Sequence, residues 1–460
     1  MKKKIFLFVS LLFLAGCSQK NSFDIQSKTF RSGMEFYLLE NHTLPTTFYS
    51  ITVKSGSVRD PAGKEGLANL TIKMLLRGTK NRNRSQILED IDFLGAALSA
   101  NVDYDSIQLV GKTLSRTQDR FFELLSDVLL NPTFPKEEFE KLKSETTGQL
   151  QLLTEDDRGL NRVRFTQWLY QGFPYGRLTT GTPSSIKNIT LSDVKDFYQT
   201  HFLGSNMILA AAGDVEKSPI KEWVNQYMGS TREGKVEPYQ YPQVPTIAKS
   251  RILLVDKPDR TQTQILVGQY GVSGDSADFY PLYVGNVSFG GTFTSTLMRE
   301  IRVKRGWSYG AYSRFVRRKS AGEYFIWSFP ANKDTLPTID LTNKLLKDFI
   351  DKGVSKEEFE LAKQFAVRET AFITETPDRT MGEFLDGLLK GWKGYPANLR
   401  KMLEKVSYEN VQKDIPRYLK TSPFVMTIIC TASDFKEALE KQFPDAEVKV
   451  VPYDQWDISI

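Results

Sequence analysis

The side chains that most often hold a catalytic metal are scarce in this chain. Its 460 residues include only two histidines and two cysteines. His42 stands in the turn Glu40-Asn-His-Thr-Leu-Pro45, and His201 directly precedes Phe202. The two histidines are far apart in sequence, and neither has a second ligand at the spacing that a zinc site needs. We therefore expect both to be surface or packing residues, and a self-sufficient zinc hydrolase is disfavoured.

Other catalytic motifs are absent from the sequence as well. It contains no Gly-x-Ser-x-Gly elbow, no phosphate-binding glycine loop and no Cys-His pair. The net charge of +6 includes the three lysines of residues 1–16, and no basic stripe interleaved with aromatic residues follows them. A nucleic-acid partner is therefore not indicated. The 40% hydrophobic and 25% charged content is typical of a soluble globular protein.

The N-terminus has the pattern of a targeting segment. Lys2, Lys3 and Lys4 precede the apolar run Ile5–Leu14, which is too short to span a bilayer. The sequence Leu-Ala-Gly-Cys17 then resembles the lipobox of bacterial lipoproteins, in which residues 1–16 are removed and Cys17 is lipidated. Attached acyl chains would add about 0.8 kcal/mol of membrane affinity per buried methylene. We therefore expect a lipid anchor in the cell envelope; the alternative is an ordinary secretory signal. Because serine rather than aspartate follows Cys17, the resemblance implies sorting to the periplasmic face of an outer membrane.

The predicted helices and strands divide the chain into two halves. Residues 229–248 contain three prolines and no hydrophobic period, which predicts an exposed linker between domains at 28–230 and 249–455. An internal repeat supports this division, since Phe134–Lys143 matches Val354–Lys363. In both halves an amphipathic helix precedes the repeated segment, and a strand pattern opens the half. We predict an α+β fold of two homologous α/β domains, each an antiparallel-rich sheet covered by helices.

The second cysteine belongs to one of the predicted strands. Cys430 ends the apolar run Val425–Cys430, which is typical of a buried strand. We expect Cys430 to be an inert core thiol. Because lipid would consume Cys17, no disulfide is expected.

Several segments, in order, resemble the pitrilysin/insulinase family of zinc metallopeptidases, and together they cover nearly all of residues 28–455. The segment that resembles the zinc site is Gly66–Thr79, and those that resemble the end of the first domain are Phe173–Gly176, Gly181–Thr182, Ile186–Thr190 and Asn206–Asp214. Those that resemble the second domain are Phe289–Leu297 and Arg302–Tyr309. The resemblance implies a chain that forms one half of a clamshell.

The zinc motif of that family is lost here. The resemblance implies a helix with His-x-x-Glu-His, whose histidines bind zinc and whose glutamate is the general base, and a distal glutamate ligand. The matching positions are Asn69, Ile72 and Lys73, and the distal position falls near Gln149. An ammonium at Lys73 would repel a divalent cation. We therefore expect no metal and no catalytic residue in this chain, with zinc held by a partner subunit.

The substrate-holding pair of the family is kept. The resemblance implies an arginine and, seven residues later, a tyrosine that bind and polarise the scissile peptide; here they are Arg302 and Tyr309. The alternative is structural, since cations that precede Gly306 could simply cap a helix end and Tyr309 could pack in a strand. The family also docks peptide on an edge strand of the first domain. Here that segment is Ser99–Val102, with altered residues.

The zinc motif is lost and the Arg/Tyr pair is kept, and this combination predicts which subunit of a peptidase the chain resembles. The family includes bacterial heterodimers in which one subunit carries zinc and the other supplies the Arg/Tyr pair. We therefore expect a non-catalytic, substrate-binding subunit of a zinc peptidase in the cell envelope, inactive alone, with a zinc-bearing homologue as partner and peptides or unfolded segments as substrate. The alternative function is a peptidase-derived scaffold or binding protein of the envelope without a role in proteolysis.

Overall fold

The computed structural model describes residues 23–458, which form two domains, each built on a six-stranded sheet. Residues 1–16 and Cys17, the expected signal and lipid attachment site, lie outside the described residues. The first sheet has the order β1 (Gln26–Thr29), β2 (Glu35–Glu40), β6 (Met207–Gly213), β3 (Thr46–Val53), β5 (Ile107–Leu114) and β4 (Ala97–Val102). The second has the order β12 (Glu447–Pro452), β7 (Arg251–Asp256), β11 (Val425–Cys430), β8 (Gln264–Tyr270), β10 (Glu323–Pro330) and β9 (Ser308–Val316).

The two sheets share one topology. In each, the first strand of the domain core pairs in parallel with the last, as β2 does with β6 and β7 does with β11. The remaining central pairs are antiparallel in both sheets. The outermost strands differ, because β1 is antiparallel to β2 whereas β12 is parallel to β7. The prediction of two similar α+β domains with antiparallel-rich sheets is confirmed.

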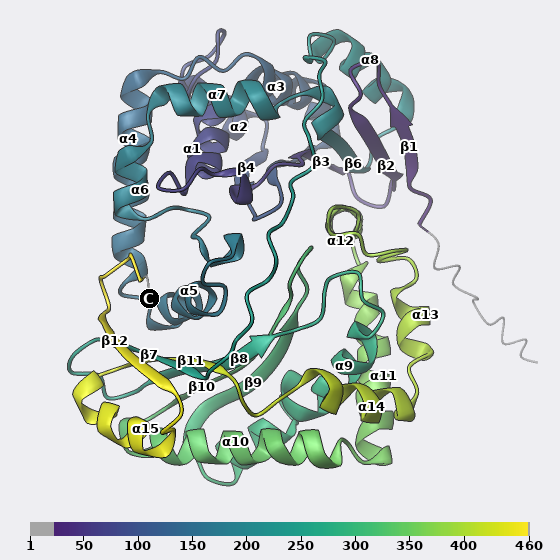
Figure 1. Ribbon diagram of the computed structural model, residues 1–460. Coiled ribbons are helices and arrows are strands. Elements are labelled where there is room, and N and C mark those ends of the chain that lie inside the picture. The colour runs from purple at the N-terminus through teal and green to yellow at the C-terminus, as the bar shows by residue number, and fades with distance from the viewer. Residues whose placement is uncertain (1–22, 459–460) are drawn as a thin grey trace, which may run out of the picture.

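Helices cover both sheets (Figure 1). The first domain contains α1 (Leu67–Met74), α2 (Arg84–Phe93), α3 (Gln118–Leu130), α4 (Lys136–Leu153), α5 (Asp157–Leu169), α6 (Pro183–Asn188), α7 (Leu191–His201) and α8 (Lys217–Tyr227). The second contains α9 (Phe279–Asn286), α10 (Thr335–Lys352), α11 (Lys356–Ile373), α12 (Pro377–Lys390), α13 (Leu399–Glu404), α14 (Tyr408–Tyr418) and α15 (Lys436–Gln442). The repeated segments of the sequence become the beginnings of α4 and α11. Within residues 23–458, none of these helices combines the length and apolar character needed to cross a bilayer.

The first-domain core forms where alternating strand residues meet the apolar faces of helices. Tyr49 and Ile51 of β3 point into it, and Phe122 and Leu125 of α3 pack against them. The ring of Phe122 lies 5.6 Å from the ring of Tyr49 in an edge-to-face arrangement. Burial of large side chains of this kind contributes about 1.5–3 kcal/mol each. This core fixes α1 and α3 on one face of the first sheet.

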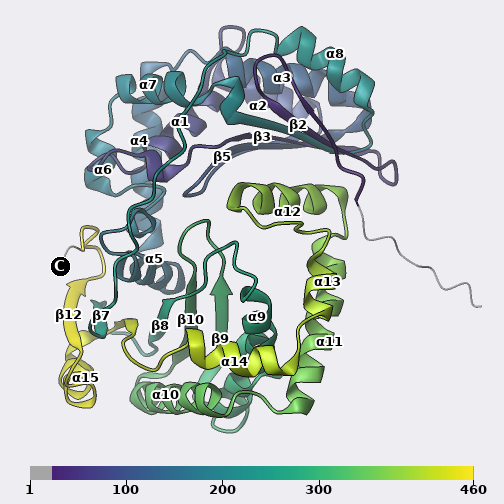
Figure 2. The ribbon, with the colours of Figure 1, turned by 45° about the vertical axis from the view of Figure 1, so that its right-hand side comes forward.

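In each domain, one helix packs on the sheet of the other domain (Figure 2). Phe165 and Trp168 of α5 lie in one apolar cluster with Leu253 of β7 and Leu266 of β8, in the second sheet. In return, Met381 of α12 packs on the first sheet in a cluster with strand β6. The exchange covers the faces of the two sheets that look toward each other, so the domains share a core instead of meeting at their surfaces.

The segment 229–248 connects the domains and contains no helix or strand. In Figure 1 it runs from the upper domain to the lower one. Tyr239, Tyr241, Val244 and Ile247 are partly buried against the cluster formed by α5 and the second sheet. Most residues of the segment are exposed, and the partly buried ones attach it to this cluster.

Candidate functional site

Helix α1 carries the positions of the zinc motif, and Asp60 holds its N-terminus. The Asp60 carboxylate accepts hydrogen bonds from the backbone N–H of Gly66 at 2.8 Å and of Ala68 at 2.9 Å. Burial raises the pKa of Asp60 to about 7, against the opposing effect of these two bonds. Gly66 has a φ of 96°, and a Cβ there would lie 2.7 Å from the carbonyl oxygen of Thr180. Only glycine fits where the chain enters this helix.

The three motif positions on α1 offer no metal ligand of the usual kind. Ile72 is buried in the first-domain core. Asn69 is 2% exposed, and its Nδ2 has no hydrogen-bond partner among the described residues. Lys73 is half-buried, and burial, followed by the nearby charge of Arg77, lowers its pKa. An amide, an alkyl group and an ammonium replace the two imidazoles and the carboxylate of the family motif.

The fourth position does not complete a site either. Gln149 lies on α4 with its side chain exposed, and the next residue, Leu150, is buried. In the described part of the chain, no group of three or more His, Cys, Asp or Glu side chains is placed to hold a metal. Zinc selects thiolate, imidazole and carboxylate ligands. The residues at Asn69, Ile72, Lys73 and Gln149 therefore do not fit a zinc ion, and we assign no catalytic step to them.

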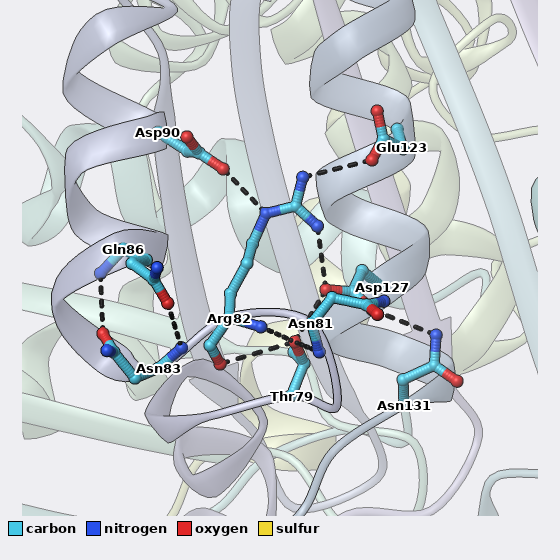
Figure 3. Close-up of polar contacts among 9 residues, drawn as sticks. All are labelled: Thr79, Asn81, Arg82, Asn83, Gln86, Asp90, Glu123, Asp127 and Asn131. Atoms are coloured by element: carbon cyan, nitrogen blue, oxygen red, sulfur yellow. Dashed lines mark hydrogen bonds and ion pairs between the residues drawn. The ribbon is translucent and has the colours of Figure 1, made fainter.

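The scaffold around α1 is nevertheless intact. The loop that follows α1 is tied to α2 and α3 by Arg82, as Figure 3 shows. Its guanidinium pairs with Asp90 at 2.7 Å, Glu123 at 3.1 Å and Asp127 at 2.9 Å. The side chain of Asp127 is 4% exposed and also accepts a hydrogen bond from Thr79. The first domain has thus kept its framework while losing the donors at the motif positions.

Arg302 and Tyr309 lie together in the second domain. Arg302 belongs to the π-helical segment Met298–Val303, and Tyr309 is the second residue of β9. The Arg302 guanidinium carbon lies 4.4 Å from the centre of the Tyr309 ring and 4.5 Å from that of Phe293. Both rings are mostly exposed, at 74% for Tyr309 and 59% for Phe293. Both rings contact the planar cation by cation–π attraction.

The other cations near Arg302 all pair with one acid, Glu300. Arg299, Lys304 and Arg305 approach the carboxylate of Glu300 at 3.6, 2.7 and 3.1 Å respectively. Arg302 is different, because no acceptor for its guanidinium occurs among the described residues. A structural role at a helix end explains the three cations that contact Glu300. It does not explain why Arg302 is aligned between two exposed aromatic rings.

In each domain an edge strand of the sheet lies beside these sites. β9 forms one edge of the second sheet and carries Tyr309, and β4 forms the matching edge of the first sheet. On β4, Ser99 and Asn101 are exposed, and the Asn101 Nδ2 donates to the Ser99 Oγ at 3.3 Å. An edge strand has backbone N–H and C=O groups that an extended peptide can pair with.

The two histidines have separate structural partners. His42 is exposed, and its Nδ1 lies 2.6 Å from an Asp214 carboxylate oxygen, which raises the pKa of His42. The His201 Nδ1 lies 3.1 Å from the Ser55 Oγ, and its ring contacts the ring of Phe197. Burial lowers the pKa of His201 to about 4. They lie in different surroundings and do not form a ligand pair.

Two protein-family models match this chain. The model described as "Insulinase (Peptidase family M16)" matches residues 36–182, and the model "Peptidase M16 inactive domain" matches residues 188–365. Together they span well over half of the chain. The chain belongs to peptidase family M16.

Individual relatives of this M16 chain carry different descriptions. A Helicobacter pylori protein named "Non-peptidase homolog YmxG" is 25% identical over 402 residues, which is 85% of this chain and 90% of that one. A Bacillus subtilis protein named "Uncharacterized zinc protease YmxG" is 19% identical over 88% of this chain and 98% of its own. The crystal structure of a peptidase M16 inactive domain from Pseudomonas fluorescens has a TM-score of 0.79 at 23% identity, covering 88% of this chain and 98% of that chain. The last comparison shows that the fold is shared.

The sequence did not predict that Phe293 belongs to the candidate site. Phe293 lies within the segment Phe289–Leu297 that resembles the family, yet nothing in its spacing relative to Arg302 predicts that the two side chains meet. They are nine residues apart, and the π-helical turn that carries Arg302 brings them into contact. Two π-helical segments, Val287–Gly291 and Met298–Val303, flank the turn that contains Phe293, and a standard helical period could not reveal them.

Proposed function

We propose that this M16 chain is the non-catalytic, substrate-binding subunit of a heterodimeric peptidase whose zinc is held by a homologous partner. The observation that supports this most is the Arg302 guanidinium, which is aligned by Phe293 and Tyr309 and meets no acceptor in the described residues. In the first domain, α1 has no ligands that fit zinc. A domain that can bind a peptide but cannot activate water needs a second chain to complete the chemistry.

The chemistry of the Arg302 region suits an extended peptide. A guanidinium offers five N–H donors in a fixed fork, which can bind a peptide carbonyl or a terminal carboxylate. Tyr309 adds an exposed hydroxyl that can donate to the same substrate. The unpaired edge of β9 can align the backbone of the peptide by strand addition. Folded proteins present few free strands, so the substrates would be peptides or unfolded segments.

The proposed location is the cell envelope, with the mature chain anchored by lipid on Cys17. The support is the sequence Leu-Ala-Gly-Cys17 after a short apolar run. Labelling of intact cells with a palmitate analogue tests the anchor, and Cys17→Ser should abolish both labelling and membrane association. Labelling that survives this substitution would contradict the assignment.

The pairing is tested by reconstitution. The zinc-bearing M16 homologue of the same organism is purified alone and together with this chain, and the cleavage of a quenched fluorescent peptide is measured. We expect the chains to co-elute and the mixture to be at least about tenfold more active than either alone, because peptide binding and metal chemistry would come together only in the complex. Full activity of the zinc homologue alone, unchanged by this chain, would contradict the proposal.

A scaffolding or binding role without proteolysis is the second candidate. It is favoured by the name of the H. pylori relative, which describes a non-peptidase. A pull-down from solubilised membranes separates the two: a scaffold recovers unrelated envelope proteins and no zinc-bearing homologue.

A further inference from the structure

Helix α11 has an apolar face that stays exposed in the described chain. Leu361, Phe365 and Phe372 lie on this face, at spacings of four and seven residues that bring them to one side of a helix. Their exposed fractions are 62%, 45% and 65%. They line a hollow of about 410 Å³, whose other lining residues also belong to α11. Apolar side chains that gather on one exposed face indicate an interaction surface, whereas scattered ones do not.

The fold itself does not require this face to be apolar. The internal repeat aligns α11 with α4, so that Lys141 and Glu145 occupy the positions of Leu361 and Phe365. Lys141 is exposed, and Glu145 forms ion pairs with two arginines. At the third position Leu152 is also apolar. Since the related helix has polar side chains at two of the three positions, the apolar face of α11 serves a contact outside the described chain.

The chain enters the first domain on the side where α11 lies. Ile25 packs in an apolar cluster with Met381 of α12, and α12 follows α11 after residues 374–376. In Figure 1, β1 and α11 are both on the right-hand side of the molecule. In Figure 2, the purple start of the chain is again on the side of α11 and α13. The beginning of the described chain and α11 therefore lie on one side of the molecule.

This placement determines where a lipid on Cys17 would hold the chain. From Cys17 to Phe23 the chain can extend at most about 20 Å. A lipid on Cys17 would keep Phe23, and with it this side of the molecule, close to the membrane. The apolar face of α11 is then near a bilayer, so a bilayer is the occupant that the observations favour.

The size of the face argues against a stable protein interface. At roughly 200 Å² for each of the three side chains, the exposed fractions leave about 350 Å² of apolar surface. A specific protein interface buries about 800 Å² on each partner. A membrane contact needs less area, because an attached lipid already holds the chain at the surface and a small apolar contact is enough to fix its orientation.

The charges along α11 indicate how the helix lies against a bilayer. Arg368 stands between Phe365 and Phe372 and has no ion-pair partner among the described residues. Glu357 and Glu360 are exposed near the other end of the helix. An arginine can lay its alkyl stem along apolar side chains and extend its guanidinium to a phosphate. The C-terminal part of α11 therefore suits the lipid interface, and its acidic N-terminal part suits water.

We propose that the apolar face of α11 contacts the surface of the lipid bilayer to which the chain is anchored. This inference rests on the lipid proposed at Cys17. Phe365 and Phe372 enter the boundary between headgroups and acyl chains, and the Arg368 guanidinium binds a lipid phosphate. The contact fixes the orientation of the two domains relative to the membrane.

A tether that replaces the lipid tests this contact. The mature chain, residues 17–460 with Cys17→Ser, carries an N-terminal histidine tag and is bound to nickel-chelating vesicles of phosphatidylethanolamine and phosphatidylglycerol. Because Cys430 is buried, Gln364→Cys provides an accessible thiol on the apolar face for an environment-sensitive dye. Lipids with a nitroxide group in the acyl chain should quench this dye by about twofold or more. The same dye at Lys141→Cys, on α4 at the opposite side of Figure 1, should not be quenched.

The side chains of the face are tested on the same vesicles. Phe365→Ser combined with Phe372→Ser should abolish quenching at Gln364→Cys and leave the thermal midpoint nearly unchanged, because both rings are exposed. Phe365→Trp combined with Phe372→Trp should retain the quenching. Unquenched dye at Gln364→Cys, equal quenching at Lys141→Cys, or quenching that survives the two serines overturns the proposal.

A protein contact has a separate signature. A fluorescence change at Gln364→Cys on addition of the zinc-bearing homologue without vesicles would assign the face to a protein and overturn the membrane contact. The lipid anchor is judged independently, because the tag replaces it on the vesicles. Absence of palmitate labelling at Cys17 in cells refutes the anchor, whereas unquenched dye on vesicles refutes the contact of α11 with the bilayer.

Discussion

Arg162 on α5 and Glu323 on β10 form an ion pair that joins the two domains through a carboxylate with no exposed surface. Arg318 donates to the same Glu323 oxygen at 3.1 Å. The guanidinium of Arg318 also lies 4.7 Å from the ring of Tyr104, in the first domain. The exchanged helix α5 is thus held by charge as well as by apolar packing, so the two domains should behave as one unit.

Glu323→Gln tests this contact. The substitution keeps the size of the side chain but leaves the charges of the partly buried Arg162 and Arg318 without their acid, so we expect a loss of about 3 kcal/mol in the free energy of unfolding. Urea unfolding measures it. The control is Glu404→Gln, which removes an exposed helical pair with Arg400 and should cost less than about 0.5 kcal/mol. Equal stabilities of the two variants would refute the role of Glu323.

Asp127 should make the first domain sensitive to acid. Burial raises the pKa of Asp127, but hydrogen bonds from Thr79, Asn131, Asn81 and Arg82 outweigh it, so this pKa is lowered overall. A lowered folded-state pKa adds stability above the unfolded-state value near 4, and this stability is lost as the pH falls through the folded-state value. Asp127→Asn should therefore destabilise the chain by about 2 kcal/mol at pH 7 and by less near pH 3.

The pH series is measured by urea unfolding, with Asp92→Asn, an exposed carboxylate on α2, as the matched control. A constant deficit for Asp127→Asn from pH 7 to pH 3 would show that the charge of this carboxylate is unimportant.

His201 should make the stability of the folded chain depend on pH in a higher range than Asp127 does. Its pKa is lowered to about 4 by burial and then by the charge of Arg59, whereas an unfolded histidine titrates near 6.5. Between these values the unfolded chain binds more protons, so stability rises with pH from about 4 to about 6.5. His201→Gln should flatten the unfolding midpoint across this window.

His42→Gln is the informative comparison for that experiment. The pKa of His42 is raised by Asp214, so its contribution is present at low pH and is lost as the pH rises through that pKa. The two variants should change the slope in opposite directions. An identical pH profile for His201→Gln and the wild type would contradict the assignment of a neutral, buried imidazole.

The absence of zinc is a prediction from donor chemistry. Because Asn69, Ile72, Lys73 and Gln149 provide no imidazole or carboxylate, the purified chain should contain less than about 0.1 zinc per molecule. Its thermal midpoint should not move on addition of zinc or EDTA, because a bound metal would stabilise the folded state by mass action. Stoichiometric zinc in metal analysis would overturn the assignment.

Much of the fold follows from local sequence patterns. The alternation Tyr49-Ser-Ile51-Thr-Val53 predicts a strand, and β3 contains these residues. The run Val425–Cys430 predicts a buried strand, and every residue of β11 is buried. The structure adds β2 and β7, which precede the strand patterns that opened each half. A period of two or of 3.6 residues carries this information because it reports which face of an element is buried.

Relationships between distant residues could not be predicted in this way. Nothing in the sequence of α5 indicates that its apolar residues pack on the other domain's sheet. The contact between Arg302 and Phe293, and the pairing of Glu323 with two arginines, likewise depend on how elements pack. For the candidate site, Arg302 and Tyr309 were predicted from family resemblance, and their proximity became evident only from the structure.

We propose that Arg302 binds substrate for a partner's zinc. This role is tested by kcat/KM of the reconstituted heterodimer with Arg302→Ala and, as control, Arg305→Ala, whose side chain pairs with Glu300. Loss of a charged hydrogen-bond donor to the substrate should lower kcat/KM by about 30- to 100-fold for Arg302→Ala, and Arg305→Ala should stay within about twofold of wild type. Equal kcat/KM for wild type and Arg302→Ala, in complexes that assemble normally, would contradict a substrate-binding role of Arg302.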